Sequence, residues 1–239
     1  MLLRLRNSVA SMTGMSRAQE RTANNLANAG TIGFKRERAF VEVLNEKIDT
    51  DGGPQSNRAI RQWIDFSAGE QEKTGNTFDF SLNGDGFFVL SNPESEELRY
   101  TRAGRMTLTE DGDLQSLSGM SLQGEGGPIQ IPPGTSEVEV KPDGSVFADG
   151  NQIAQLAVVN FEDTSVLQRR GGAEFSAGEA ESIESNATIR QGYVEHSNTE
   201  PLEAMTGMIE HLRLFEMQQR MLRSTDENLS QSIRSLGRF

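Results

Sequence analysis

Residues 23–40 read ANNLANAGTIGFKRERAF, and this stretch marks the end of an N-terminal helical pattern. Asparagine is a mediocre helix former and a good turn former, so the placement of Asn24, Asn25 and Asn28 needs a reason. The alanines around them are small enough for another helix to approach, and each amide can donate and accept hydrogen bonds there without carrying a charge. The stretch therefore predicts that these asparagines and Leu26 contact neighbouring helices. A capped helix end without a partner would explain the glycines but not the three asparagines.

The second half of the stretch predicts a tight turn. Gly30 is expected to form a left-handed C-terminal cap of the helix, and Gly33 to allow the turn that returns Phe34 to the helix end or to the rest of the fold. The cations that follow are then expected to face solvent or the acidic part of a neighbouring copy: Lys35, Arg36 and Arg38.

Upstream of the stretch, apolar or small residues recur at alternating steps of four and three. This period is typical of an α-helix with one face against another surface. The positions are Leu5, Val9, Met12, Met15, Gln19, Thr22 and Leu26. We expect Leu5, Val9 and Met12 to belong to a subunit interface, together with the asparagine run.

The C-terminal segment has a longer and stricter repeat, with steps of three and four over more than four heptads. The positions are Met205, Met208, Leu212, Phe215, Gln219, Leu222, Asp226, Leu229, Ile233 and Leu236. Because eight of these ten residues are apolar, the pattern predicts a coiled-coil seam, in which Gln219 and Asp226 would fix the register and the partner. Packing on the chain's own central part is the alternative. The length of the repeat and its terminal position favour contacts between subunits.

The central part of the chain has the pattern of antiparallel β-structure. Turn dipeptides separate short apolar runs, as in hairpins. The dipeptides are Asn83-Gly84, Asp85-Gly86, Asp111-Gly112, Asp143-Gly144 and Asp149-Gly150. The predicted fold class is therefore α+β, with long N- and C-terminal helices packed as a coiled coil and a central antiparallel all-β domain. The predicted domains are 1–38 with 198–239 (helical assembly), 39–77 (extended connector) and 78–197 (β domain).

The composition excludes several classes of protein. The formal net charge of the 239 residues is −12, with seven Lys/Arg against two Asp/Glu in residues 1–38 and eleven against twenty-seven in residues 39–198. The acidic part would repel phosphates, so nucleic acid is not an expected partner. No apolar run reaches the length of a membrane span, and the start is not an expected secretory signal. Without cysteine, neither disulfides nor thiolate metal sites can form.

No set of residues predicts an enzyme. His196 and His211 are the only histidines, and no Gly-x-Ser-x-Gly motif is present. The segment from Gly84 to Phe88 lacks the lysine and the following helix of a phosphate loop, so Gly84 and Gly86 are predicted to form a hairpin turn. The acids at 110–113 lack the alternate spacing of a calcium loop. We expect no catalytic residue, no cofactor, no metal and no small-molecule substrate.

Three segments together resemble the bacterial flagellar rod and hook proteins. The run from Asn24 to Arg36 resembles the signature of this family, with mild departures at Gly30 and Ile32. The stretches 82–88 and 100–104 resemble the first β segment of the family, and 191–198 with the start of the last helix resembles its C-terminal signature. The matches follow one another in order along the chain. Within the family, the chain resembles the proximal rod protein most and the distal rod protein next.

The resemblance implies a non-enzymatic structural subunit of the flagellar basal-body rod, the axial drive shaft across the periplasm. Its terminal helices would form an inner tube and assemble helically. The implied partners are copies of the chain, neighbouring rod proteins and the flagellar type III export machinery. The alternative is a binding module, in which the β domain recognises a ligand or peptidoglycan and the helices form an oligomerisation stalk.

Overall fold

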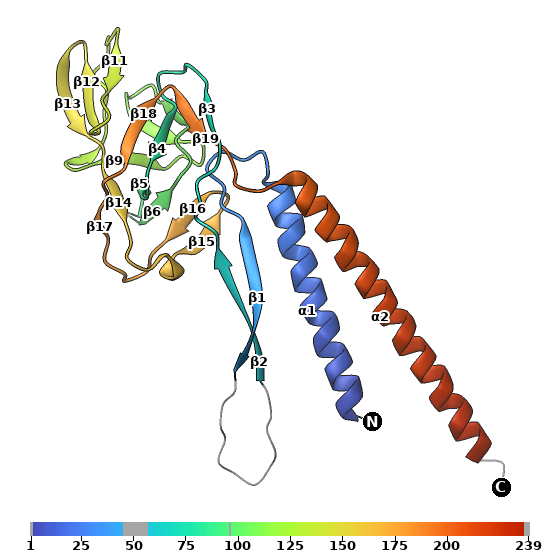
Figure 1. Cartoon of the computed structure of the whole chain (residues 1–239). Coiled ribbons are helices and arrows are strands. Elements are labelled where there is room, and N and C mark those ends of the chain that lie inside the picture. Colours follow the sequence, from blue (N-terminus) through green and yellow to red (C-terminus); the bar gives the residue numbers. More distant parts are fainter. Residues whose placement is uncertain (1, 45–56, 96, 237–239) are drawn as a thin grey trace. The chain divides into compact units, whose positions relative to one another are not determined.

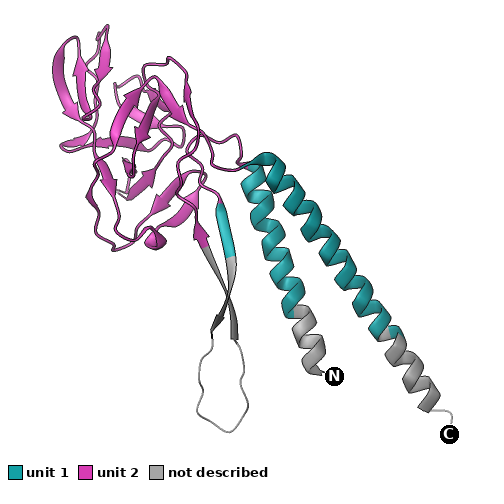
Figure 2. Cartoon of the chain, in the orientation of Figure 1, with its two compact units in different colours: residues 1–27, 37–62, 200–239 teal, residues 28–36, 63–199 magenta. Residues whose placement is uncertain are grey.

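The computed structural model describes residues 2–44, 57–95 and 97–236, and within them the side chains of residues 10–39, 63–95, 97–225 and 227. The chain divides into two compact units (Figure 2). The first, which we call the helical unit, comprises Met1–Ala27, Glu37–Gln62 and Glu200–Phe239. The second, which we call the β body, comprises Asn28–Arg36 and Trp63–Thr199. Each unit thus collects segments that are far apart in the sequence.

The helical unit contains α1 (Leu2–Ala27) and α2 (Pro201–Leu236), which run in opposite directions (Figure 1). The Ser11 hydroxyl donates to Gln218 Oε1 at 3.4 Å. Near the C-terminal end of α1, the Thr22 methyl group would lie 3.8 Å from a Cβ on Gly207, which is near the start of α2. These two points of contact establish an antiparallel pair. In the described part of the chain, neither helix is long and apolar enough to cross a membrane.

The predicted coiled coil is wrong. A coiled coil buries both alternating seam positions, but Met205 and Leu212 are 49% and 45% exposed. The face of α2 that is half-buried instead carries Ala204, His211 and Gln218 at the equivalent positions. These side chains are small or polar, so they form no continuous apolar seam. None of the described side chains of α1 or α2 is fully buried.

Two strands, β1 (Glu37–Leu44) and β2 (Asn57–Ile64), pair with each other as a two-stranded sheet. Together with β3 (Gln71–Lys73) they lie within residues 37–73, so the predicted connector at 39–77 contains regular strands. The predicted domain boundaries themselves stay a prediction.

The largest sheet of the β body has ten strands. Their bounds are β5 (Phe87–Ser91), β6 (Leu98–Thr101), β7 (Met106–Leu108), β8 (Leu114–Ser116), β9 (Ser121–Gly124), β10 (Gly127–Pro128), β14 (Val158–Asn160), β15 (Gln168–Gly171), β16 (Glu174–Ser176) and β17 (Ile183–Glu184). The order is β15-β16-β6-β5-β9-β8-β7; β10 pairs with β9, and β14 pairs with β5 and β17. The pairs between β5 and its neighbours β6, β9 and β14 are antiparallel. The predicted antiparallel character of the central part is therefore confirmed.

Three smaller sheets complete the β body. The first joins β11 (Val138–Val140), β12 (Ser145–Ala148) and β13 (Asn151–Gln155); the second joins β4 (Phe80–Asn83) and β18 (Thr188–Gln191); the third joins β3 and β19 (Tyr193–Glu195). A 3-10 turn, η1 (Thr164–Val166), precedes β15. The β4–β18 and β3–β19 pairs bring residues 71–83 together with residues 188–195, more than a hundred positions later.

Most of the predicted turn dipeptides close hairpins. Asp111-Gly112 joins β7 to β8, Asp143-Gly144 joins β11 to β12, and Asp149-Gly150 joins β12 to β13. The φ angles of Asp149 and Gly150 are +48° and +81°. Two successive positive φ angles match the twist of antiparallel strands, which is why Asp-Gly is favoured there.

The hairpin predicted at Gly84 and Gly86 is wrong. The strand before this turn, β4, pairs with β18, whereas the strand after it, β5, belongs to the ten-stranded sheet. The turn therefore carries the chain from one sheet to another. A Cβ on Gly86 would lie 2.4 Å from the Ser185 hydroxyl, and Gly84 has a φ of +118°, so close packing and backbone conformation require glycine here.

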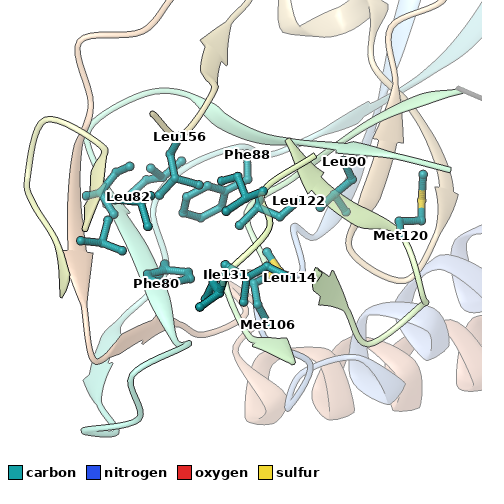
Figure 3. Close-up of a cluster of buried hydrophobic side chains, with 14 residues drawn as sticks. Phe80, Leu82, Phe88, Leu90, Met106, Leu114, Met120, Leu122, Ile131 and Leu156 are labelled. Atoms are coloured by element: carbon teal, nitrogen blue, oxygen red, sulfur yellow. The ribbon is translucent and has the colours of Figure 1, made fainter. Parts of the chain in front are cut away.

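The main core lies between the sheets of the β body (Figure 3). Phe80 and Leu82 from β4 meet Phe88 and Leu90 from β5, and Leu122 from β9 completes the centre. A second cluster joins Phe87, Tyr100, Phe161 and Phe175, with Phe66 in edge-to-face contact with Phe87 and Phe175 at ring-centroid distances of 5.2 and 5.1 Å. Both clusters lie inside the β body.

Candidate functional site

The predicted interface residues of α2 divide into two groups. Met205 and Leu212 are exposed, whereas Met208, Phe215, Gln219 and Leu222 are half-buried. The side chains of the remaining four lie outside the described residues: Asp226, Leu229, Ile233 and Leu236. The half-buried members share the face of α2 that carries Gln218, which contacts α1.

Large apolar side chains are exposed on the rest of α2. Leu202, Met205, Ile209 and Leu212 recur at steps of three and four, which places them on one flank of the helix. Leu214, Met217 and Met221 follow with the same spacing and are exposed as well. We call these seven residues the apolar rows of α2. Exposed apolar patches occur at interaction surfaces, in ligand-binding grooves and at aggregation sites.

On α1, Met12 and Leu26 are half-buried, as are Met15, Gln19 and Thr22 of the same predicted face. Leu5 and Val9 lie outside the residues whose side chains are described.

The asparagines of the opening stretch have different environments. Asn25 forms a closed pair of hydrogen bonds with the first residue of β1: its Nδ2 donates to the Glu37 carbonyl, and the Glu37 N–H donates to its Oδ1, both at 2.9 Å. Asn28 accepts from the Thr31 hydroxyl at 3.2 Å and, through its carbonyl, from the Thr31 N–H at 3.0 Å. Asn24 is exposed beside a pocket that Arg17, Glu20, Arg21 and Glu37 also line. The amides of Asn25 and Asn28 thus have partners within the same copy.

The left-handed backbone conformation after α1 lies at Gly33 and not at Gly30. Gly30 is not in the left-handed region, and a Cβ there would meet nothing within 4 Å. Gly33 has a φ of +68°, and a Cβ would lie 2.1 Å from the backbone nitrogen of Ala103. The left-handed cap predicted at Gly30 is therefore wrong. Gly33 is the residue that requires glycine, because the chain passes there against the segment after β6.

Phe34 is fully buried in the β body. The guanidinium of Arg169 lies over its ring, 4.3 Å from the centroid, and over the ring of Phe175 at 5.1 Å. Arg169 also donates to the carbonyl of Gly172 at 2.6 Å and to the carbonyl of Lys35. The aromatic ring and the cation therefore hold the segment after α1 against β15 and β16.

Lys35 does not face solvent, contrary to the sequence prediction: its exposed fraction is 0%. Its ammonium donates to a carboxylate oxygen of Glu195 and to the Ser67 carbonyl at 2.7 Å. The Gly69 N–H donates to the same oxygen of Glu195 at 2.9 Å. Arg102, also buried, lies with Nη1 3.5 Å from the other oxygen of Glu195. Two buried cations thus share one buried carboxylate.

We call Lys35, Arg102 and Glu195 the junction cluster. Burial lowers the pKa of Lys35 from its ordinary value, and the nearby Glu195 carboxylate opposes part of that change. Burial lowers the pKa of Arg102 as well. Within the part of the chain that the structure describes, Arg102 Nε and Nη1 and Glu195 Oε2 have no hydrogen-bond partner. The cluster therefore depends on the charge of Glu195, because removal of one partner leaves a buried charge without compensation.

Asn198 continues the same junction. Its Oδ1 accepts from the Arg36 N–H at 2.8 Å, and its Nδ2 donates to the carbonyls of Asp65 and Ser67 at 2.7 and 3.1 Å. The Arg36 side chain forms an ion pair with Asp65 at 3.1 Å, so Arg36 does not face solvent freely either.

The junction brings together the three segments that carry the sequence resemblance. Lys35 lies in the first segment, Arg102 in the second and Glu195 in the third. Sequence reasoning missed these three residues and Asn198 as one site. The available signal was that each of the three motifs contains one of these charged residues.

The chemistry of the junction is electrostatic. The charged groups of the junction cluster are closed to solvent, and the carboxylate stabilises the two cations. Among the described residues, no group of three histidine, aspartate or glutamate side chains is placed to hold a metal ion.

Comparison with known proteins gives two family matches. Residues 81–148 match the flagellar hook protein FlgE/F/G D1 domain, and residues 190–235 match the C-terminal domain of the flagellar basal body rod FlgEFG proteins. The chain is 33% identical over 226 residues to the flagellar basal-body rod protein FlgF of Salmonella typhimurium, with 87% of each chain covered. It is 32% identical to FlgF of Caulobacter vibrioides, with 91% of each covered. It is also 31% identical to the flagellar basal-body rod protein FlgG of Buchnera aphidicola subsp. Schizaphis graminum, with 87% of this chain and 89% of the relative covered.

Proposed function

The chain belongs to the family of flagellar basal-body rod proteins and is a structural subunit of that rod, and from this premise we propose that it joins the rod through α1 and α2. The observation that carries the proposal is the apolar rows of α2. The exposed fractions of these side chains range from 42% for Leu214 to 76% for Leu202. A helix with apolar side chains outside its half-buried face needs a further surface to cover them.

The proposed partners are copies of the chain and neighbouring rod proteins. Contacts between two different surfaces of successive subunits generate an open helical array when the rotation does not close. Such an array would place many equivalent apolar contacts along a shaft, which would let it act as the axial drive shaft. The predicted interface residues on both helices belong to this proposal, with Asn24 as the exposed member of the opening stretch.

Two finer assignments belong to the same proposal. We propose that the chain reaches the rod through the flagellar type III export machinery, since a chain without cysteine forms no disulfide that would hold it folded before passage. We also propose that it occupies the proximal rather than the distal part of the rod and has no enzymatic activity. The relatives named above include both FlgF and FlgG, so they support the family and leave this finer choice as a proposal.

The test is Leu212→Asp. A charge in the middle of the first apolar row would be costly to bury between subunits, so we expect loss of the chain from isolated basal bodies and loss of motility. The matched control is Leu117→Asp, at a leucine that is 74% exposed on the turn between β8 and β9 of the β body.

Both variants should keep the unfolding midpoint of the wild-type chain, because both leucines are exposed. Leu222→Asp, on the half-buried face, is a second variant expected to block assembly. Normal incorporation of the Leu212→Asp chain into basal bodies would contradict the proposal. Light scattering against concentration would separate open growth from the small closed oligomer that the alternative binding module predicts.

A further inference from the structure

Two segments that lie far apart in the sequence run beside each other through the junction. Residues 28–36 lead out of α1, and residues 195–199 lead into α2. The Gly33 N–H donates to the Glu195 carbonyl at 2.7 Å, and the Asn198 N–H donates to the Phe34 carbonyl at 3.4 Å. Since both pairs advance in the same direction, the two segments are parallel neighbours. We call them the α1 root and the α2 root.

The junction cluster joins these two roots to the rest of the β body. The Glu195 carboxylate of the α2 root forms ion pairs with Lys35 of the α1 root and with Arg102 of the segment after β6. The Gly69 N–H donates to Glu195, and Lys35 donates to the Ser67 carbonyl. Each root loses part of this balance without the other, because Lys35 would lose its Glu195 carboxylate and Glu195 would keep only Arg102 as its cation.

We propose that the junction cluster is a positioning lock that couples the α1 root to the α2 root, so that loosening either root loosens both. The proposal rests on the proposed role of α1 and α2 in assembly only for its consequence in the rod. There, the segment before α2 would be held in place only while the segment after α1 is held as well. The lock itself is a property of a single copy.

The charges predict an asymmetry that a merely structural contact would not produce. Glu195→Gln leaves Lys35 and Arg102 buried without their carboxylate. Lys35→Met leaves Glu195 with Arg102 and the Gly69 N–H, so the remaining charges stay balanced. We therefore expect Glu195→Gln to be the more damaging change. Adding Lys35→Met to Glu195→Gln should partly restore the lock, since it removes one of the two buried cations that lose the Glu195 carboxylate.

Hydrogen exchange on the purified full-length chain tests the lock, because local opening of a segment raises the exchange of its protected amides. In Glu195→Gln, exchange in the α1 root, about 160 positions from the substitution, should rise at least about tenfold. In Lys35→Met, exchange in the α2 root should rise by a smaller factor. In the double variant, exchange in both roots should fall below that of Glu195→Gln.

The control is Arg99→Gln. Arg99 pairs with Glu97 at 3.1 Å, and Glu97 is 49% exposed, so the substitution leaves no buried charge and should change exchange in neither root. Peptides from β5 report on global opening of the β body. If Glu195→Gln raises exchange in β5 as much as in the roots, that variant opens the whole β body. The lock is then tested by whether Lys35→Met raises exchange in the α2 root.

Exchange that rises only in the root carrying the substitution, or effects that simply add in the double variant, would overturn the lock. The measurement uses isolated chains, so it is independent of assembly. If the roots are coupled but the Leu212→Asp chain still assembles, the lock stands and the proposed assembly surface is wrong. If the roots are not coupled but Leu212→Asp blocks assembly, the lock is wrong and the proposed assembly surface stands.

Discussion

The β body and the helical unit bury their apolar side chains to very different degrees. In the β body, aromatic and aliphatic residues from several strands are fully buried, among them Phe80, Phe88 and Leu122. In the helical unit, none of the described helix side chains is buried, and α2 exposes leucine, isoleucine and methionine. The difference teaches that one copy suffices to build the core of the β body, whereas the helices have much apolar surface left for partners.

One pair of leucines tests this comparison with the largest expected effect. Leu122→Ala removes a side chain with 0% exposure from the main core and should lower the free energy of unfolding by about 2–5 kcal/mol. Leu202→Ala removes the same atoms from a leucine that is 76% exposed on α2 and should change it by less than about 0.5 kcal/mol. Urea unfolding followed by tryptophan fluorescence and circular dichroism measures both. Equal losses would break the comparison.

A second pair of variants tests the segment that follows α1 in the chain, where the sequence passes from one region to the other. Gly33→Ala forces a Cβ against Ala103 at a positive φ and should cost about 1–3 kcal/mol of stability. Gly30→Ala, three residues earlier, meets nothing and lacks a positive φ, so it should be neutral or slightly stabilising. The same unfolding measurement applies. A neutral Gly33→Ala would show that the α1 root is not held against the segment after β6.

The smallest expected effect concerns the pH dependence of the β body. Burial lowers the pKa of Lys35, so the unfolded chain binds more protons than the folded chain between that lowered pKa and about 10.4. The free energy of unfolding should therefore rise with pH across this window, by at most about 1.4 kcal/mol per pH unit from this group. Lys35→Met should flatten the rise.

The comparison of interest is the difference between the two slopes, because burial also raises the pKa of Tyr100, which removes stability at still higher pH. A wild-type slope equal to that of Lys35→Met would mean that Lys35 is not buried as a titrating group. The slopes are obtained from urea unfolding at a series of pH values.

The two helices illustrate how far periodicity alone can be used. On α1, the described residues that recur at steps of four and three, Met12, Met15 and Leu26 among them, are on the half-buried face. On α2, the strict heptad correctly predicts the helix, but only part of it lies on the half-buried face: Met208, Phe215 and Leu222 do, whereas Met205 and Leu212 are exposed. Apolar residues occupy several faces of α2, so the sequence pattern is compatible with more than one orientation, and the partner helix selects among them.

The turns show the same division between local and long-range information. Asp149-Gly150 closes a hairpin as predicted, because its two positive φ angles are a local property of the dipeptide. Gly84 and Gly86 also form a turn, but the strand that pairs with β4 is β18, more than a hundred residues later. A turn signal fixes where the chain bends and does not identify the strand that pairs next.

The sequence by itself determined the two terminal helices, the antiparallel β-structure between them and the family, because periods, turn dipeptides and motifs are local properties of the chain. Only the tertiary structure decided that Lys35, Arg102 and Glu195 meet, that Gly33 rather than Gly30 needs its missing side chain, and that the heptad of α2 is partly exposed. Each of these depends on which distant segment comes alongside. A charge in a motif indicates that a partner exists, and the fold alone supplies the partner and removes both from water.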